Sequence, residues 1–234
     1  MAKNKPVYAF EEADSKKRML LGGKGAGLSE MTRLKLPVPP GFTITTEVCN
    51  KYYDNNGKLP KDVMPAVMKN IAKMEKKTGK KWNSTKNPLL VSVRSGAAIS
   101  MPGMMDTILN LGLNEKTVEG FAEQTKNPRF SWDSYRRFIQ LFGKVVFGVN
   151  DEKFDHVLDD AKEKQGVTDD SKLSVESLKS IVSKYKKICE EHTKRKFPDT
   201  PNEQLVLSIE AVFKSWMGER AIVYREKNNI TKDI

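Results

Sequence analysis

The sequence predicts a mixed α/β fold that carries an all-helical insertion. Up to about residue 113, short apolar runs alternate with helical patterns, which is typical of mixed α/β structure. From about Asn114 the pattern is helical alone, until a last helix whose apolar face is wide enough to pack on the α/β part. We therefore predict an α/β subdomain over residues 1–113 and 198–234, and a helical subdomain over residues 114–197.

The α/β part begins with two strands and three helices. Residues 7–10 predict a strand, and residues 25–34 a helix with Leu28, Met31 and Leu34 on one face. The Pro-rich segment 37–46 predicts a second strand, after which Thr45 or Thr46 can cap a helix over residues 47–55. Apolar residues at helical spacing predict a further helix over residues 63–76. Residues 88–94 form the strongest strand pattern of the sequence.

The later helices are marked by apolar stripes and caps. An aromatic stripe runs through residues 131–149, with Ser131 as a candidate cap, and two more charged helices follow at residues 151–166 and 174–196. The last helix begins with Thr200 as cap and Pro201 at the first helical position. Residues 220–229 predict a strand or the end of a helix.

The composition is that of a globular protein with an excess of positive charge. Of 234 residues, 38% are hydrophobic and 30% are charged, which argues against disorder. The net charge of +11 predicts attraction to nucleic acid, a membrane or a phosphorylated ligand. Lysine clusters at residues 76–81 and 194–196 come without a nucleic-acid-binding motif, so we expect no nucleic-acid partner.

Cysteine usage and hydropathy limit the environment of the chain. The two cysteines, Cys49 and Cys189, have neither disulfide-framework nor zinc-site spacing. No apolar run reaches the length of about 18 residues that a membrane span requires, and the N-terminus has no signal-peptide pattern. We expect an intracellular, soluble protein without a membrane partner, cytoplasmic or in an organelle, whose two histidines lie on the surface.

A glycine-rich segment, LLGGKGAGL at residues 20–28, is a candidate phosphate cradle between a strand and a helix. Gly23 and Gly25 belong to a run of glycines that lets backbone N–H groups approach a ligand, and Lys24 adds an ammonium. The spacing is neither a Walker A motif nor G-x-G-x-x-G. A tight turn with a solvated lysine is an equally good interpretation of this segment alone.

Arg94 is the second candidate cation. It ends the strand pattern at residues 88–94, where the crevices of open α/β sheets form, and its planar guanidinium suits a phosphate. A salt bridge to a nearby carboxylate is the alternative. With Lys24, Arg94 would make a site for a polyphosphate. Asp106 is the only carboxylate close to the candidate loops, so the sequence shows no pair of magnesium ligands.

Five segments of the sequence resemble the N-terminal part of the pyruvate phosphate dikinases. The resemblance extends from about Val7 to Asn229, and its longest segment is PLLVSVRSGAAISMPGMMDTILNLGLN at residues 88–114. The most specific motif is the part from residue 100 onward, SMPGMMDTILNLGLN. The other segments are LLGGKGAGLSEM, VPPGFTITTE, NPRFSWDSYRRFIQLFG and RAIVYR. Members of this family are several times longer, so the resemblance implies that the chain is a piece of a larger enzyme.

The resemblance implies the first subdomain of an ATP-grasp nucleotide-binding unit, with the C-terminal grasp subdomain absent from this chain. In the family, the β-phosphoryl group of ATP passes by way of a pyrophosphoryl intermediate to a histidine on a swivelling domain, while phosphate accepts the γ-phosphoryl group. A barrel domain then uses the phosphohistidine to convert pyruvate to phosphoenolpyruvate. The implied cofactors are ATP and Mg²⁺, with the metal ligands outside this chain, and the implied assembly is a homodimer.

The resemblance also assigns roles to residues. Lys24 and Arg94 match the catalytic contacts to the ATP phosphates, and the loop from Met101 to Thr107 matches a flexible loop on the phosphate side with Gly103 as its pivot. Arg137 and Arg220 match arginines that could meet the swivelling domain. The implied nucleotide-binding residues of the loop are Met101, Gly103, Met104, Asp106 and Thr107.

The methionines of this loop admit two interpretations. Thioethers fit irregular gaps, so Met101, Met104 and Met105 are suited to adaptable packing beside a mobile loop. Plain core packing is an equal alternative for Met101. The remaining alternatives for the whole chain are a related dikinase that phosphorylates water, a glucan or a drug, and a non-enzymatic anion-binding module.

Overall fold

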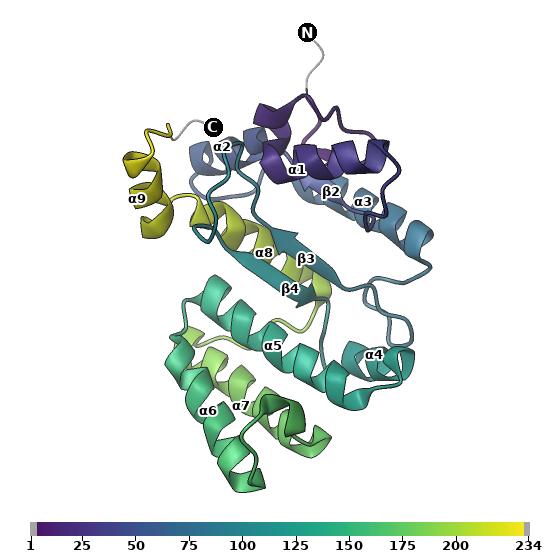
Figure 1. Ribbon diagram of the computed structural model, residues 1–234, viewed down its shortest axis with the longest axis vertical. Coiled ribbons are helices and arrows are strands. Elements are labelled where there is room, and N and C mark those ends of the chain that lie inside the picture. The colour runs from purple at the N-terminus through teal and green to yellow at the C-terminus, as the bar shows by residue number, and fades with distance from the viewer. Residues whose placement is uncertain (1–3, 232–234) are drawn as a thin grey trace. The chain divides into compact units, whose positions relative to one another are not determined.

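The computed structural model describes residues 4–231, which form two compact units (Figure 1). The first unit contains the described residues up to Gly79, together with Arg94–Asp106 and the residues from Ile209 onward. The second contains Lys80–Val93 and Thr107–Ser208. The elements are β1 (Val7–Ala9), α1 (Arg18–Arg33), β2 (Phe42–Ile44), α2 (Thr46–Asp54), α3 (Val63–Thr78), β3 (Val91–Arg94), β4 (Thr107–Leu111), α4 (Thr117–Thr125), α5 (Pro128–Phe147), α6 (Asp151–Gln165), η1 (Asp170–Lys172), α7 (Val175–Thr193), α8 (Pro201–Ser215) and α9 (Glu219–Lys227).

The described residues contain more helix and less sheet than a mixed α/β fold suggests. Two sheets of two strands each are present, β1 with β2 and β3 with β4. Strands of three to five residues support only small sheets, so most of the buried apolar area comes from helix packing. The fold is therefore compatible with the predicted class in its coarse form, a mixture of helices and strands.

In the first unit, β1 and β2 pair antiparallel, with Val7 opposite Ile44, and α3 packs against β1. The buried apolar face of α3 includes Val63, Val67 and Ile71, as the helical spacing predicts. Thr45 occupies the cap position of α2, although its side chain makes no capping hydrogen bond. These elements confirm the predicted strands and helices of the first third of the chain.

The glycine-rich segment is a broken helix, and the prediction of a turn between a strand and a helix is wrong. Residues from Arg18 are already helical, and the helix is interrupted at Gly22, where φ is 70° and ψ is 163°. A side chain is excluded there for two reasons: φ is left-handed, and a Cβ would lie 1.6 Å from the Gly96 carbonyl oxygen. The glycine thus allows direct backbone contact between α1 and the segment after β3.

The predicted apolar face of α1 points outward. Met31 and Leu34 are 38% and 55% exposed, and the buried face is built instead from small residues such as Gly25, Ala26 and Ser29. A Cβ on Gly25 would lie 2.6 Å from the Thr43 Oγ1 atom, so β2 packs directly against the helix backbone. Close packing against a strand, rather than apolar periodicity, decides which face of this helix is buried.

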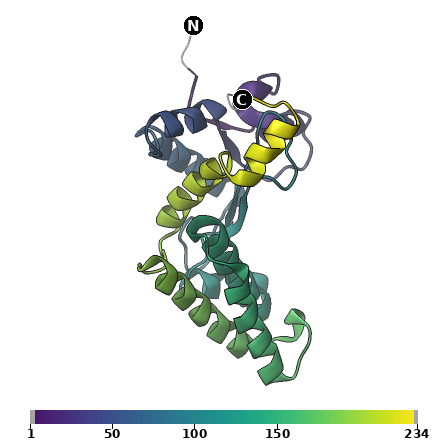
Figure 2. The same cartoon turned by 90° about the vertical axis from the view of Figure 1, so that its left-hand side faces the viewer.

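The second unit packs helices α4 and α5 around each other, α5 on β4, and α6 and α7 beside α5 (Figure 2). The predicted aromatic stripe of α5 forms its core, and residues Trp132, Tyr135, Phe138, Ile139 and Phe142 are buried. The ring centroids of Phe138 and Phe142 lie 5.4 Å apart, and both contact Phe197. His156 and His192 are exposed, as expected.

Helix ends show which capping predictions hold. Asn127, not Ser131, caps α5: its side chain accepts a hydrogen bond from the Phe130 N–H at 3.0 Å, and Ser131 lies inside the helix. The Pro at the first helical position starts the helix one turn earlier than the apolar stripe does. Thr200 caps α8 as predicted, accepting from the Glu203 N–H at 3.3 Å. The segment 220–229, predicted as a strand or helix end, contains most of helix α9.

The two compact units differ in extent from the predicted subdomains. Residues 80–93, 107–113 and 198–208, predicted in the α/β part, belong to the same unit as the helices. Residues 1–3 and 232–234 of the predicted α/β subdomain lie outside the described residues. Within residues 4–231, no helix has both the length and the apolar character that crossing a membrane requires.

Candidate anion-binding site

Lys24 lies just after the break in α1 and faces the segment that follows β3. Its Nζ atom donates a hydrogen bond to the Ser95 carbonyl oxygen at 2.9 Å, while the side chain remains largely exposed. Partial burial, and second the charge of nearby Arg94, lower the pKa of Lys24 below that of an ordinary lysine. An ammonium has three donor hydrogens, so two remain for a ligand.

Arg94 ends β3, as predicted, but it is not at the edge of a buried strand. The strand is half-buried in alternation, and the Arg94 side chain is exposed. Within residues 4–231, neither Lys24 nor Arg94 forms an ion pair with a carboxylate. The alternative of a salt bridge at Arg94 therefore has no partner in the described part of the chain, and two neighbouring cations stand without a counterion.

Residues 95–98, which directly follow Arg94, contact α1 around Lys24. The Gly23 N–H donates to the Ala97 carbonyl oxygen at 2.8 Å, next to the Lys24 contact with Ser95. A Cβ on Gly96 would lie 3.2 Å from the Lys24 Cβ atom. The small residues after Arg94 thus let this segment lie directly on α1. We call residues 95–106 the strap.

The second half of the strap contains a preformed turn. The Met104 N–H donates to the Met101 carbonyl oxygen at 3.2 Å, and Gly103 between them has φ of 73°. Pro102 followed by a glycine with positive φ is the sequence signature of a type II turn. Gly103 therefore has a conformational reason to be glycine, and its role as a pivot remains a prediction.

The methionines of the strap pack inward. Met101 is 8% exposed and forms an apolar cluster with Trp216 and Ala221. Met104 and Met105 are half-buried against the same cluster. Core packing thus accounts for Met101, and this arrangement directs its side chain into the protein instead of toward Lys24.

The other predicted site residues lie in three places. Asp106 accepts from the Arg220 Nη2 atom at 3.3 Å, so two residues predicted for different roles form one ion pair. Gly25 is buried against Thr43. Thr107 is the first residue of β4 and belongs to the second unit. Arg137, also in the second unit, is exposed and pairs with Asp133 at 3.0 Å.

Sequence reasoning missed two arginines in the first unit. The Arg18 Nε atom donates to the Ala98 carbonyl oxygen at 2.9 Å, which adds a third contact between α1 and the strap. Arg225 is only 5% exposed, and its guanidinium carbon lies 4.1 Å from the centre of the Trp216 ring. Arg18 directly precedes the glycine-rich segment and could have been included with it. Nothing in the pattern of residues 220–229 marks Arg225 as buried.

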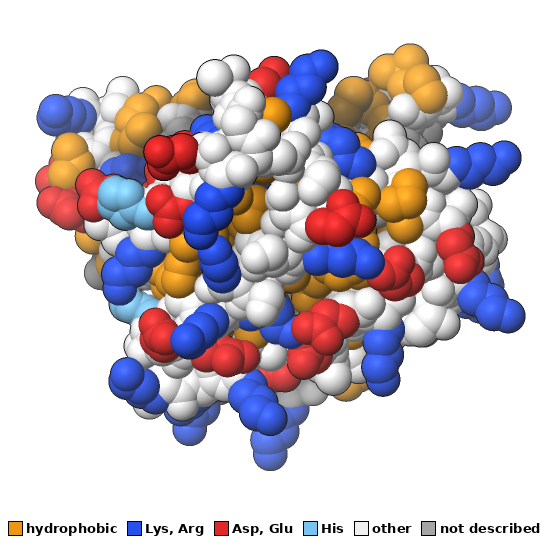
Figure 3. Space-filling view, turned by 90° about the horizontal axis from the view of Figure 1, so that it is seen from below, with side chains coloured by type: hydrophobic (Ala, Val, Ile, Leu, Met, Phe, Trp, Pro, Cys, Tyr) orange, Lys and Arg blue, Asp and Glu red, His pale blue; other side chains and the backbone are white. Residues whose placement is uncertain are grey.

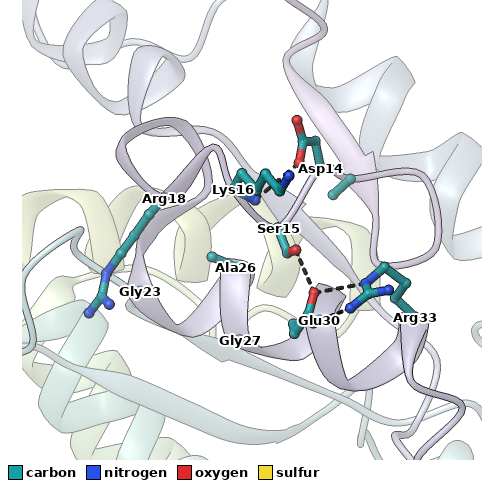
Figure 4. Close-up of a pocket in the computed structure, with 10 residues that line it drawn as sticks. Asp14, Ser15, Lys16, Arg18, Gly23, Ala26, Gly27, Glu30 and Arg33 are labelled. Carbon is teal, nitrogen blue, oxygen red and sulfur yellow. Dashed lines mark hydrogen bonds and ion pairs between the residues drawn. The ribbon is translucent and has the colours of Figure 1, made fainter.

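A shallow groove of about 720 Å³ lies along a different face of α1 (Figure 4). Glu30 accepts hydrogen bonds there from Arg33 and from Ser15. These two hydrogen bonds lower the pKa of Glu30 to about 2, so the carboxylate is charged and already satisfied. In Figure 4 the Arg18 side chain points away from this group. The residues that line the groove include both acidic and basic side chains, and its Glu30 carboxylate is already paired with Arg33.

The charge of the surface is mixed on the face seen in Figure 3. Basic side chains are interspersed there with acidic ones and do not gather in one patch. The local arrangement at Lys24 and Arg94 is more informative about a ligand than the net charge is.

The described residues do not form a metal site by themselves. Within residues 4–231, no three His, Cys, Asp or Glu side chains group closely enough to hold a metal ion. Asp106, the carboxylate nearest to the strap's end, is paired with Arg220. The described side chains around Lys24 and Arg94 therefore do not fit a magnesium ion.

Comparison with known proteins identifies the family. The model of the family described as pyruvate phosphate dikinase, AMP/ATP-binding domain, matches residues 18–59 and 55–234. The chain belongs to this family. Both Lys24 and Arg94 lie within the matched residues, as does the whole strap.

Among the relatives of this pyruvate phosphate dikinase domain are three proteins named pyruvate, phosphate dikinase. The one from Entamoeba histolytica is 53% identical over 97% of this chain. Those from Clostridium symbiosum and Giardia intestinalis are 49% and 50% identical over 97% and 96% of it. The matched region is 26% of each relative, so the chain spans about a quarter of the length of these curated relatives.

Proposed function

We propose that the chain is the phosphate-binding part of the ATP site of a pyruvate phosphate dikinase. The observation that carries the proposal is that the Lys24 Nζ atom donates to the carbonyl oxygen of Ser95, the residue directly after Arg94, while within residues 4–231 no carboxylate pairs with either cation. Burial and, second, the charge of Arg94 lower the pKa of Lys24. Two cations in this arrangement repel each other until an anion lies between them. A phosphate chain supplies several negative oxygens at once, which suits a guanidinium beside an ammonium.

The elements around Lys24 and Arg94 position these two cations for binding. The break of α1 at Gly22 brings the strap onto the helix, and Ser95 orients the Lys24 ammonium through its carbonyl group. Arg94 is fixed at its backbone by β3 and is free at its guanidinium. These residues bind and orient the phosphates. The family's nucleotide specificity, AMP or ATP, supports a nucleotide as the source of these phosphates.

For the longer polypeptide we propose the activity named for the relatives. In it, an ATP-grasp unit completed by a second subdomain would bind ATP with Mg²⁺, whose ligands would lie outside the described residues. ATP, phosphate and pyruvate would be the substrates, a histidine on another domain would carry the phosphoryl group, and the enzyme would be a homodimer. Gly23 and Gly103 would border the nucleotide, and Arg220 would face the histidine domain.

Binding of phosphates to this chain tests the proposal directly. Titration calorimetry with ATP, pyrophosphate, AMP and adenosine should show affinity that rises with the number of phosphates. With only two cations and no second subdomain, we expect dissociation constants in roughly the millimolar range. Lys24→Gln and Arg94→Gln should each weaken binding, and Arg137→Gln, which removes another exposed arginine, should not. Adenosine that binds as well as ATP would contradict a phosphate site.

The longer enzyme allows a sharper separation. There Arg94→Ala should abolish phosphorylation of the histidine by ATP and leave the enolisation of pyruvate at the distant barrel intact. Equal loss of both partial reactions would show that Arg94 acts on folding. Full dikinase activity of the present 234 residues alone would contradict the proposal that the chain is only part of the site.

A further inference from the structure

The C-terminal half of the strap, residues 101–106, packs against the corner between α8 and α9. We propose that this corner, through Ser215, Trp216, Arg220 and Arg225, clamps residues 101–106 and so positions the strap for the anion site. All the contacts of the clamp lie within the first unit. Its effect on phosphate binding rests on the proposed function.

The apolar half of the clamp is the cluster around Trp216. Met101 and Trp216 are 8% and 5% exposed, and Ala221 at the start of α9 is fully buried with them. Met104 and Met105 pack on this cluster, as does Tyr224. Unbranched thioethers adapt to the irregular surface of an aromatic ring and a helix corner, and sulfur contacts with aromatic rings are themselves favourable. The methionine-rich composition of the strap is thus explained by what it covers.

Arg225 braces the aromatic ring from within the corner. Its guanidinium stacks over the Trp216 ring with the carbon 4.1 Å from the ring centre, and its Nη1 atom donates to the Trp216 carbonyl oxygen. No carboxylate in the described residues pairs with Arg225, so the ring face and the carbonyl group satisfy its buried charge. The surface on which Met101 rests is therefore held in one orientation.

The polar half of the clamp holds Asp106. Its carboxylate accepts from Arg220 Nη2 at 3.3 Å, and its backbone N–H donates to the Ser215 Oγ atom at 3.4 Å. Ser215 ends α8 and Arg220 begins the first turn of α9, so both contacts come from the corner. The ion pair is exposed, with Arg220 at 65% and Asp106 at 28%, and such pairs are weak. It can therefore break without unfolding the cluster.

The two halves of the strap are consequently held by different means. Residues 95–98 are held to α1 by hydrogen bonds from Arg18, Gly23 and Lys24. Residues 101–106 are held to the corner by apolar packing and one exposed ion pair. The exposed residues Ile99 and Ser100 join them. Ala97 of the first half also packs on the Trp216 cluster. Because the contacts of Asp106 lie in the second half, loosening Asp106 should increase the motion of that half first.

Hydrogen exchange of backbone amides in this chain tests the clamp. Arg220→Gln and Asp106→Asn should speed exchange in residues 99–106 by about two- to fivefold, the effect of an exposed ion pair. The exchanged pair, Asp106→Arg with Arg220→Asp, should restore the slower rate. Arg137→Gln is the matched control, because Arg137 is 61% exposed and pairs with Asp133 in the other unit.

Two outcomes would overturn the clamp. One is unchanged exchange in residues 99–106 in both single variants. The other is the same acceleration in Arg137→Gln, which would show a nonspecific effect of charge. Trp216→Leu provides the test of the apolar half: it should speed exchange there by more than Arg220→Gln does, with thermal melts to show that the unit stays folded.

Pyrophosphate titration of the same variants separates the clamp from the proposed function. Arg220→Gln should weaken pyrophosphate binding by about two- to fivefold, in proportion to the added motion, and by less than Lys24→Gln does. If the unmodified chain binds no pyrophosphate, the proposed function fails, while the exchange experiment still decides the clamp. If the chain binds pyrophosphate and Arg220→Gln changes binding but not exchange, the clamp is wrong.

Discussion

Two pairs of neighbouring cations, one in each unit, differ in whether carboxylates neutralise them. Arg136 in α5 is 2% exposed, and its Nη2 atom lies 2.7 Å from Asp133 and 3.4 Å from Asp170. Its neighbour Arg137 shares Asp133. Lys24 and Arg94 in the first unit have no carboxylate partner in the described residues. The buried Arg136 thus has carboxylate partners within the described residues, and the exposed Lys24 and Arg94 have none there.

The difference has a physical basis in desolvation. Burial opposes the charge of Arg136, yet the charge and the hydrogen bond of Asp133 outweigh it, and the pKa of Arg136 is raised. At Lys24 both burial and Arg94 act against the charge, and the pKa is lowered. A bound anion stabilises the charged form of a cation most where the surroundings disfavour that form. The comparison therefore separates a structural ion pair from the proposed anion site.

The largest expected effect comes from breaking the buried pair. Arg136→Ala should lower the free energy of unfolding by roughly 3 kcal/mol, because Asp133 and Asp170 lose the cation that compensates them. Urea denaturation followed by circular dichroism measures this. Arg137→Ala, at the exposed position next to it, should cost less than about 1 kcal/mol. Equal costs at the two positions would remove the distinction between them.

The second effect is on binding alone. Lys24→Gln and Arg94→Gln should each weaken pyrophosphate binding by about 10- to 100-fold, the range of a lost charge-assisted hydrogen bond. Arg136→Ala, in the molecules that remain folded, should leave it unchanged. Calorimetry at a fixed salt concentration gives the three values. A lower pyrophosphate affinity of the folded Arg136→Ala variant would contradict the proposal that Lys24 and Arg94 bind the anion without Arg136.

The third effect is on protonation. Bound pyrophosphate, or the Arg94→Gln substitution, should raise the pKa of Lys24, because each removes or offsets the neighbouring positive charge. Pyrophosphate affinity should fall as pH rises through the pKa of Lys24, beginning at lower pH than for an ordinary lysine. Nuclear magnetic resonance of the labelled lysine Nζ and Cε atoms follows the titration. A Lys24 pKa that is the same with and without Arg94 would show that the two charges do not interact.

The smallest expected effect is on stability. The lowered pKa of Lys24 means that its charged form is less favourable in the folded chain than in the unfolded chain. Stability should therefore increase as pH rises through the folded-state pKa of Lys24. For the same reason Arg94→Gln should stabilise the fold, by roughly 0.3 kcal/mol, the size of one exposed charge interaction. Thermal unfolding of the variant and the unmodified chain compares them, and a loss of stability would contradict the repulsion.

Prediction from sequence succeeded where periodicity or caps govern the structure. The stripe of α5, the helix from Val63 and the cap at Thr200 all appear as expected. It failed where packing replaces periodicity. Met31 and Leu34 lie on the exposed face of α1, because glycine and alanine let β2 approach the opposite face. The glycine run was recognised as special, yet as a turn and not as a broken helix.

The candidate site was predictable in its residues and not in their surroundings. The sequence by itself determined that Lys24 and Arg94 are candidate cations, since this depends on chemistry within a few residues. Only the tertiary structure decided that the two cations lack a carboxylate partner in residues 4–231, and that Asp106 meets Arg220, 114 residues away. Pairing of distant charges depends on which surfaces the chain packs together, and no local pattern carries that information.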